Sequence, residues 1–309
     1  MKYALIKTFG VTALAAAVAA CGGDSSSGSD STASTGSMSV GLTDAPVDGV
    51  SEVNIVVTGL VLQPDDGERV TFTLEEPANL NLLDLQGGAV EALVTSEDVP
   101  AGDYSWMRLQ LGEQSEFSVL TDEGGMENLR VPSGDQRGLQ TSGFVVPAGG
   151  EVSFTIDFDV RKSLVYPPGQ DQYLLKPVLR LVDNSEVGTL VGEVDYATLN
   201  QDETLGCNYE GAAYVYTGTV TEENLTDLNV TLTGDEAETQ PLVVVPINQD
   251  AADSLYSYTA AFLPAGEYTV SYSCQIDDNE ASDDLTFVGT QQVTIEAGET
   301  TTATTIPSE

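Results

Sequence analysis

Two aspartates separated by one residue lie within the longest run of alternating apolar residues. Apolar side chains recur at every second position across residues 152–160, which predicts a β-strand, and Asp157 and Asp159 then project from its opposite face. Two carboxylates can serve a hydrolase if they share a proton or face a substrate cleft. This pair is therefore the first candidate for chemistry.

Basic residues cluster beside this strand. Half of the eight lysines and arginines that follow residue 20 are Arg161, Lys162, Lys176 and Arg180. Arg161 continues the face of the two aspartates, while Lys176 and Arg180 share a face of the next predicted strand, so cross-strand ion pairs explain the clustering without an active site. A hydrolase is the remote alternative. Another is a ligand site, in which Lys176, Arg180 and the two aspartates bind a small anion or an acidic ligand.

The sequence contains no histidine. Histidine is the usual general base of enzymes and the commonest transition-metal ligand. Its absence indicates a protein that is not an enzyme.

Acidic loops suggest a different chemistry, the binding of a hard cation. Asp44 and Asp48 flank Pro46 after the first predicted strand, and calcium accepts carboxylates and loop carbonyls in loose geometry. The other interpretation is turn chemistry, in which aspartates accept hydrogen bonds from nearby backbone N–H groups.

A denser acidic loop lies between two predicted strands near the C-terminus. Its candidate calcium ligands are Asp277, Asp278, Asp283 and Asp284. Their spacing does not fit an EF-hand, so the loop is either a weak calcium site or a solvated surface loop. Calcium is the only cofactor that the sequence suggests.

The segments that must position these residues read as strands. Short alternating runs, such as residues 53–57, 70–74 and 268–272, are separated by Gly, Pro, Asp and Asn. A strand spacing of about ten residues favours antiparallel sandwiches. The predicted fold class is all-β, with two antiparallel β-sandwich domains after a signal peptide and a flexible linker.

The N-terminal residues have the pattern of a secretory signal. Lys2 and Lys7 precede an apolar run at residues 8–20, which is too short to span a bilayer comfortably, and Ala19 and Ala20 come directly before Cys21. This ending resembles the lipobox of bacterial lipoproteins. The resemblance implies that residues 1–20 are removed and that Cys21 carries acyl chains holding the protein on a membrane.

A polar segment follows the cysteine. Residues 22–37 contain no apolar residue larger than alanine, so residues 21–37 are predicted to form a lipidated flexible tether. Glycine rather than aspartate at position 22 favours the outer membrane, if this bacterium sorts lipoproteins as enteric bacteria do.

The chain is strongly acidic. It has 10 Lys+Arg against 49 Asp+Glu, and no lysine or arginine follows Arg180. Such a charge excludes binding to nucleic acid phosphates. Adaptation to salty surroundings and dedicated calcium binding both explain the excess, and adaptation predicts that added NaCl stabilises the protein.

Three cysteines occur in the sequence, at positions 21, 207 and 274. If Cys21 is lipidated, Cys207 and Cys274 form the only pair available for a disulfide outside the cytoplasm. Two free buried thiols are the alternative.

A short signature occurs twice, as Pro-Ala-Gly-Asp-Tyr at residues 100–104 and as Pro-Ala-Gly-Glu-Tyr at residues 264–268. It predicts a tight turn followed by a strand in each of two β-modules. With the end of the basic residues near Asp183, it predicts domains at residues 38–184 and 187–309.

Five ordered motifs give the first of these domains a resemblance. They are Leu42-Thr43-Asp44-Ala45-Pro46, the turn at residues 100–104, Val131-Pro132-Ser133-Gly134, Asp157-Phe158-Asp159 with Lys162-Ser163, and residues 175–180. Residues 37–184 thereby resemble the bacterial family catalogued as domain of unknown function 4382. The resemblance implies a periplasmic or surface lipoprotein domain with no assigned activity.

The second domain resembles a transthyretin-like or carboxypeptidase-regulatory-like sandwich. The resemblance rests on residues 188–192, 263–268 and 293–298. It implies a non-catalytic spacer or binding unit.

Together these patterns predict a structural or binding lipoprotein of the cell envelope. Its partners are the membrane, through the anchor, and an envelope protein or polysaccharide. The alternative is a calcium-dependent lipoprotein that binds carbohydrate or protein at the surface.

Overall fold

The structure, a computed structural model, describes residues 34–45, 50–132, 139–208, 210–233, 240–249 and 256–307. The predicted signal peptide, Cys21, all but the last residues of the tether, and Asp48 lie outside these residues. The residues from Ser34 onward belong to one compact unit. Within the described part of the chain, no helix is both long enough and apolar enough to span a membrane.

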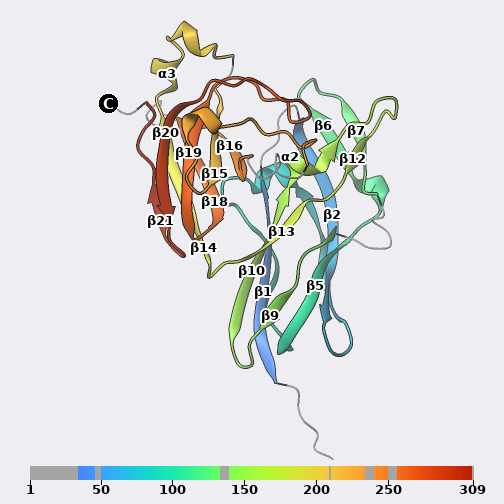
Figure 1. The fold of residues 1–309 in the computed structure, drawn as a ribbon. Helices are drawn as coiled ribbons and strands as arrows, with labels where there is room; N and C mark the ends of the chain where they lie inside the picture. The colour runs from blue at the N-terminus through green and yellow to red at the C-terminus, as the bar shows by residue number, and fades with distance from the viewer. Residues whose placement is uncertain are drawn as a thin grey trace, which may run out of the picture. The chain divides into compact units, whose positions relative to one another are not determined.

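Strands dominate the N-terminal segment, residues 35–183, as the alternating pattern predicts (Figure 1). They are β1 (Thr35–Ala45), β2 (Val50–Pro64), β3 (Val70–Asn81), β4 (Glu91–Pro100), β5 (Gly102–Leu111), β6 (Ser118–Thr121), β7 (Met126–Arg130), β8 (Leu139–Gln140), β9 (Phe144–Val146), β10 (Glu151–Asp159), β11 (Leu164–Val165), β12 (Tyr173–Leu175) and β13 (Leu179–Asp183). One helical turn, α2 (Val160–Ser163), follows β10.

These strands form two sheets. One has the order β13-β10-β1-β4, and the other has the order β11-β12-β7-β6-β2-β5-β8, with β3 added on β2 and β9 on β5. Most neighbours are antiparallel, whereas β1–β10 and β12–β7 are parallel. One apolar core takes buried side chains from both sheets, among them Leu42 and Ile156 from the first and Leu60 and Met107 from the second. The segment is therefore a sandwich.

The C-terminal segment, residues 187–306, is also built from strands. They are β14 (Val187–Val194), β15 (Ala212–Thr217), β16 (Val243–Pro246), β17 (Asn248–Gln249), β18 (Tyr256–Pro264), β19 (Gly266–Ser273), β20 (Val288–Ile295) and β21 (Thr300–Thr302), with the helical turn α3 (Tyr196–Leu199) after β14. Their sheets have the orders β17-β18-β14-β21 and β16-β15-β19-β20. In the described residues, no sheet combines strands of the two segments.

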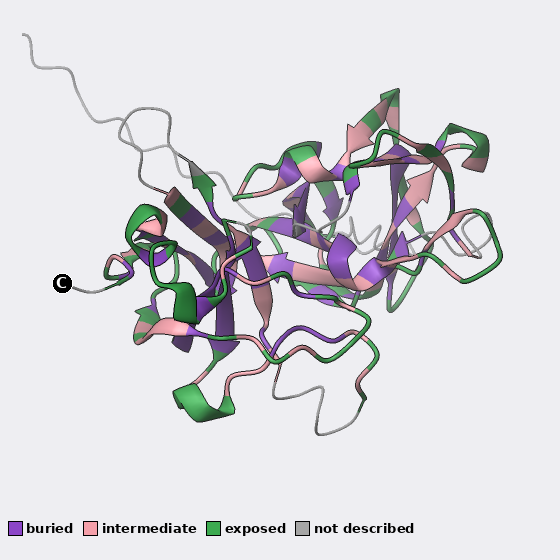
Figure 2. Cartoon of the chain, turned by 90° about the horizontal axis from the view of Figure 1, so that it is seen from above, coloured by how far each residue is buried: buried purple, intermediate pink, exposed green. Residues whose placement is uncertain are grey.

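The sheet containing β15 is covered on both faces. One core lies between the two C-terminal sheets and includes Val215 and Val270, while a smaller cluster covers the outer face and includes Tyr214, Tyr216 and Phe287. The first five residues of β15 are all buried, instead of alternating between core and solvent. Figure 2 shows buried residues along the strands and exposed residues mainly in the turns and loops.

The two segments repeat one arrangement of strands. The first strand of each pairs antiparallel with one strand and parallel with a later one: β1 with β4 and β10, and β14 with β18 and β21. The strands that follow the repeated Pro-Ala-Gly turns, β5 and β19, pair antiparallel with β9 and β20. The latter two in turn precede the parallel strands β10 and β21.

The backbone contacts of the repeated turns match as well. The N–H of Ala101 donates to the carbonyl of Ser34 (2.7 Å), and the N–H of Ala265 donates to the carbonyl of Glu186 (3.0 Å). Each turn is thereby held against the start of the first strand of its own segment.

A second pair of turns directly precedes the parallel strands β10 and β21. The N–H of Gly149 donates to the Thr35 carbonyl and that of Gly298 to the Val187 carbonyl, both at 2.8 Å. Both glycines have positive φ angles, 66° and 76°, which side chains other than glycine adopt at a cost. The duplication thus extends from the sequence motif to the hydrogen bonds.

Candidate functional site

Asp157 and Arg180 form a cross-strand ion pair. The two residues are in register between β10 and β13, and Arg180 Nη2 lies 2.7 Å from Asp157 Oδ2, with Nε at 3.1 Å. Phe154, Ile156 and Phe158 are buried on the other face of β10, as the alternation predicts. Burial raises the pKa of the Asp157 carboxyl, although the Arg180 charge acts in the opposite direction.

Asp159 is used differently from the prediction. β10 ends here, and the Asp159 side chain caps the helical turn α2 by accepting a hydrogen bond from the Lys162 N–H (3.0 Å). The Lys162 ammonium lies 3.1 Å from the same carboxylate. Lys176 is exposed, and its side chain forms no ion pair with a described residue. The four predicted ligand-binding residues therefore do not converge on one point.

Arg161 does not lie on the strand face of Asp157 and Asp159, where the strand pattern predicts it. Because the chain turns into α2 after Asp159, Arg161 is buried, and its Nη1 donates to Asn279 Oδ1 at 2.8 Å. Val160 is buried, as the predicted alternation requires, but β10 ends one residue earlier, at Asp159.

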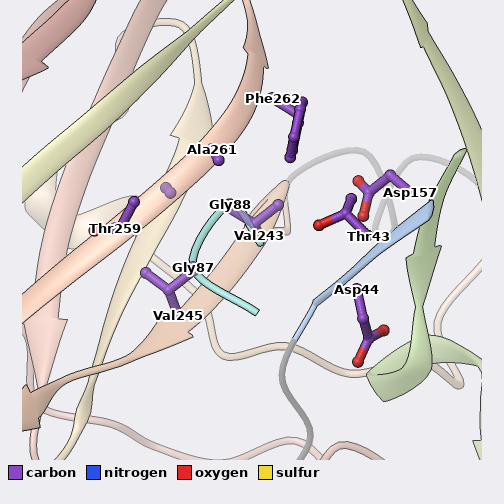
Figure 3. A pocket seen from close by; sticks show the side chains of 11 residues that line it. Thr43, Asp44, Gly87, Gly88, Asp157, Val243, Val245, Thr259, Ala261 and Phe262 are labelled. Atoms are coloured by element: carbon purple, nitrogen blue, oxygen red, sulfur yellow. The ribbon is translucent and has the colours of Figure 1, made fainter. Parts of the chain in front are cut away.

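A small cavity lies beside Asp157 (Figure 3). Thr43, Asp44 and Asp157 line one side of it, and Val243 and Phe262 lie across from them. Its volume is about 30 Å³, which holds only a water molecule or two. This cavity cannot admit a substrate to Asp157.

Asp44 lies within β1 rather than in the loop after it. It is buried, and its Oδ1 accepts a hydrogen bond from the Val160 N–H at 3.2 Å, at the start of α2. The backbone contact agrees with the turn-and-cap interpretation, and a role in calcium binding stays a prediction.

The C-terminal acidic residues divide into two groups. One carboxylate oxygen from each of Asp227, Asp277 and Asp283 lies within 4.8 Å of those of the other two, so these three form a cluster. Asp278 and Asp284 are exposed, and Asp278 accepts a hydrogen bond from the Glu280 N–H (3.0 Å). Asp227 is not among the predicted ligands because it lies far from the acidic loop in sequence.

Two loops carry the cluster across the outer face of β15. The loops are residues 225–232 and 276–285, and the N–H of Val230 donates to the Asn279 carbonyl (2.8 Å) between them. The Asp283 N–H donates to Asp227 Oδ2 at 2.6 Å. The carboxylates thus lie where the loops meet.

Asp277 is the most enclosed member of the cluster. Its side chain is 3% exposed, and Oδ2 accepts hydrogen bonds from the Tyr214 hydroxyl (3.0 Å) and the Leu228 N–H (3.2 Å). Oδ1 is buried without a hydrogen-bond partner among the described residues. Burial raises the pKa of Asp277 to about 6, against the lowering effect of these hydrogen bonds and of Arg161.

A disulfide joins Cys207 to Cys274, just before the second loop. This is the pairing expected from the sequence. It ties the start of the acidic loop to the segment between β14 and β15.

Residues 35–177 match the family model described as "Domain of unknown function (DUF4382)". The match confirms, for that segment, the resemblance carried by the five motifs. The transthyretin-like resemblance of the C-terminal segment stays a prediction. No curated protein matches the chain.

Similar solved structures include a leucine-rich repeat protein, a minor pilin and a tip fimbrial protein. A leucine-rich repeat protein from Bacteroides thetaiotaomicron is 14% identical with a TM-score of 0.22; the match covers 89% of this chain and 26% of that one, so this chain spans about a quarter of its length. The minor pilin GBS52 of Streptococcus agalactiae is 11% identical over 87% of this chain and 94% of the other, with a TM-score of 0.19.

A third such structure is the tip fimbrial protein Mfa3 of Porphyromonas gingivalis. It is 9% identical over 84% of this chain and 81% of the other, with a TM-score of 0.21. Likeness at this level carries no functional argument.

Proposed function

We propose that this chain is a non-catalytic lipoprotein of the bacterial cell envelope, anchored through Cys21 and acting outside the cytoplasm as a structural or binding protein. Residues 1–20 are its signal peptide, residues 21–37 its tether, and residues 38–184 and 187–309 its two sandwich domains. Glycine rather than aspartate at position 22 supports the outer membrane as the site of the anchor.

The disulfide between Cys207 and Cys274 is the observation that carries this proposal. Structural disulfides persist in oxidising compartments and are rare in the cytosol of bacteria. Together with the lipobox-like ending at Cys21, it supports export of the chain out of the cytoplasm. The pairing of Asp157 with Arg180 supports a structural rather than a catalytic use of the strongest carboxylate candidate.

Mass spectrometry of the protein purified from a bacterial host tests the anchor. We expect a mature chain that begins at Cys21 and carries acyl chains, and that fractionates with membranes. The variant Cys21→Ser should lose both properties and keep the same fold by circular dichroism. An unmodified Cys21, or wild-type protein in the cytosol, would refute the proposal.

An open groove favours a second candidate function, the binding of a polysaccharide. It measures about 640 Å³ and is lined by Tyr166, Tyr173 and the acids Asp122, Glu123 and Glu127. The Tyr166 and Tyr173 ring centroids are 4.8 Å apart. Aromatic rings give an amphipathic contact surface, and carboxylates accept hydrogen bonds from hydroxyl groups.

Binding to immobilised envelope polysaccharide tests this second function. We expect Tyr166→Ala to weaken retention, while Tyr256→Ala, outside the groove, leaves it unchanged. Equal retention of both variants and wild type would remove the groove as a binding site.

A further inference from the structure

We propose that Asp227, Asp277 and Asp283 bind a single divalent cation, with calcium as the fitting ion. The proposal goes beyond the envelope function and does not depend on the lipid anchor. It also revises the predicted ligand set, because Asp227 replaces Asp278 and Asp284.

Three carboxylates converge where the two loops meet. Their oxygens lie within 4.8 Å of one another, and Asp227 and Asp277 are buried, at 7% and 3% exposure. Like charges this close repel one another strongly when water is excluded. Calcium accepts carboxylate oxygens at 2.3–2.6 Å, so three oxygens within 4.8 Å of one another can share one ion, with water or backbone carbonyls supplying its remaining ligands.

One carboxylate oxygen of the cluster is buried and accepts no hydrogen bond from a described residue. Asp277 Oδ1 is buried without a hydrogen-bond partner among the described residues, while Oδ2 of the same group has two donors. A buried acceptor without a partner is costly and calls for a ligand, a water or an ion. A cation held against Asp227 and Asp283 would satisfy this oxygen.

The balance of charge around the cluster also favours a cation. No lysine, arginine or histidine follows Arg180, so the segment that carries the cluster provides no side-chain cation of its own. Arg161 enters from α2, donates to Asn279, and lowers the pKa of Asp277. One guanidinium opposes three carboxylates, which leaves a net negative charge for a divalent ion.

A cation at this cluster would have a structural role. The loops of residues 225–232 and 276–285 have no strands of their own, yet they cover the aromatic side chains Tyr214 and Tyr216 on the outer face of β15. An ion bound where the two loops meet would hold them in place over these side chains. Affinity in the range of extracellular modules, about 0.1–1 mM, suits a protein outside the cell.

Calorimetry on the full-length protein in detergent, after removal of metals with a chelator, tests the proposal. We expect saturable binding of one calcium ion and a rise in the melting temperature. Asp283→Asn, which keeps an oxygen acceptor and removes one charge, should weaken binding by about tenfold or more. Asp284→Asn is the matched control, because it removes the same charge from an exposed position in the same loop.

Terbium luminescence gives a second readout. The Tyr214 hydroxyl donates a hydrogen bond to Asp277, so excitation of tyrosine should sensitise terbium bound at the cluster. Calcium should displace the terbium. Asp227→Asn should abolish the signal, and it replaces Asp283→Asn if the latter does not fold.

Three results would overturn the proposal. They are the absence of saturable binding up to about 10 mM calcium, well above the expected range; equal binding by Asp283→Asn and wild type; and equal weakening by Asp284→Asn, which would indicate diffuse attraction by surface carboxylates.

Discussion

Asp157 and Arg180 show how a charged pair is used within a sheet. The alternation of β10 keeps Asp157 away from the apolar core, and the antiparallel register with β13 places Arg180 directly beside it. The carboxylate side chain is 13% exposed and the guanidinium side chain 29%, so water screens the pair only in part. Removing one partner of such a pair leaves a poorly solvated charge.

We therefore expect Arg180→Met to destabilise the protein by about 2 kcal/mol at neutral pH. Burial raises the pKa of Asp157 above its ordinary value, and loss of Arg180 raises that pKa further. In the folded variant, Asp157 therefore loses its proton only at a higher pH than in the wild type. The loss of stability grows as the pH rises from about 4, and it disappears at lower pH, where Asp157 is protonated.

Urea unfolding across this pH range measures the effect. Lys176→Met is the matched control, because its ammonium forms no ion pair with a described residue, and it should change stability little at any pH. A deficit for Arg180→Met that is independent of pH would show that packing rather than charge is lost.

The sequence predicted the pairing of Asp157 because strand alternation and charge are local patterns. It could not predict the roles of Asp159 and Arg161, since the strand ends where the Lys162 N–H donates a capping hydrogen bond to Asp159 and the chain turns into α2. Asp227 was beyond reach for a different reason. Its neighbours in space come from a loop about fifty residues later, and no periodicity connects the two loops.

At the scale of elements, the two repeated Pro-Ala-Gly turns form the same side-chain hydrogen bond. In each turn the tyrosine hydroxyl donates to the carbonyl of the proline four residues earlier, Tyr104 to Pro100 at 2.7 Å and Tyr268 to Pro264 at 2.8 Å. Both tyrosines are buried at 3% exposure. The motif predicted two β-modules, but the parallel strands depend on contacts far apart in sequence and were not predicted.

We expect Tyr104→Phe and Tyr268→Phe each to cost about 1 kcal/mol, because each leaves a proline carbonyl without its donor. Chemical denaturation of the two variants measures this. Tyr166→Phe, at an exposed ring in the open groove, should change stability little. If one variant loses more than about twice as much stability as the other, the two turns differ in energy despite their matching geometry.

The disulfide closes a long loop around β15. Cys207 and Cys274 are separated by 67 positions, so the chain-entropy model gives a contribution of about 4 kcal/mol to the free energy of unfolding. We expect the double variant Cys207→Ser/Cys274→Ser to lose about this amount. It should unfold at the same urea concentration with and without a reductant, whereas the wild type should become less stable only when reduced.

Oxidised wild type and double variant of equal stability would contradict this prediction. So would a double variant that still responds to reductant, because the described cysteines would then not account for the response.

At the scale of the whole molecule, charge dominates. A formal net charge of −39 makes the folded state repel itself, and the residues after Arg180 contain no base to offset their acids. The duplicated strand arrangement places similar sandwiches on both sides of Asp183, yet the four basic residues between Arg161 and Arg180 all belong to the first. Apart from Arg161, which donates to Asn279 from the first sandwich, the second sandwich has its disulfide, screening by salt and any bound cation to offset the repulsion among its acids.

We accordingly expect the chelated protein to become more stable as NaCl rises from about 0.05 to 1 M, because the screening length falls from more than 10 Å to about 3 Å. The melting temperature measures this, and a sucrose series provides the control for general exclusion of solutes. The Cys207→Ser/Cys274→Ser variant should gain more than wild type, since its acidic segment has lost its covalent tie. A melting temperature that does not change with salt would mean that the carboxylates are already far enough apart, and that charge does not limit the stability of this fold.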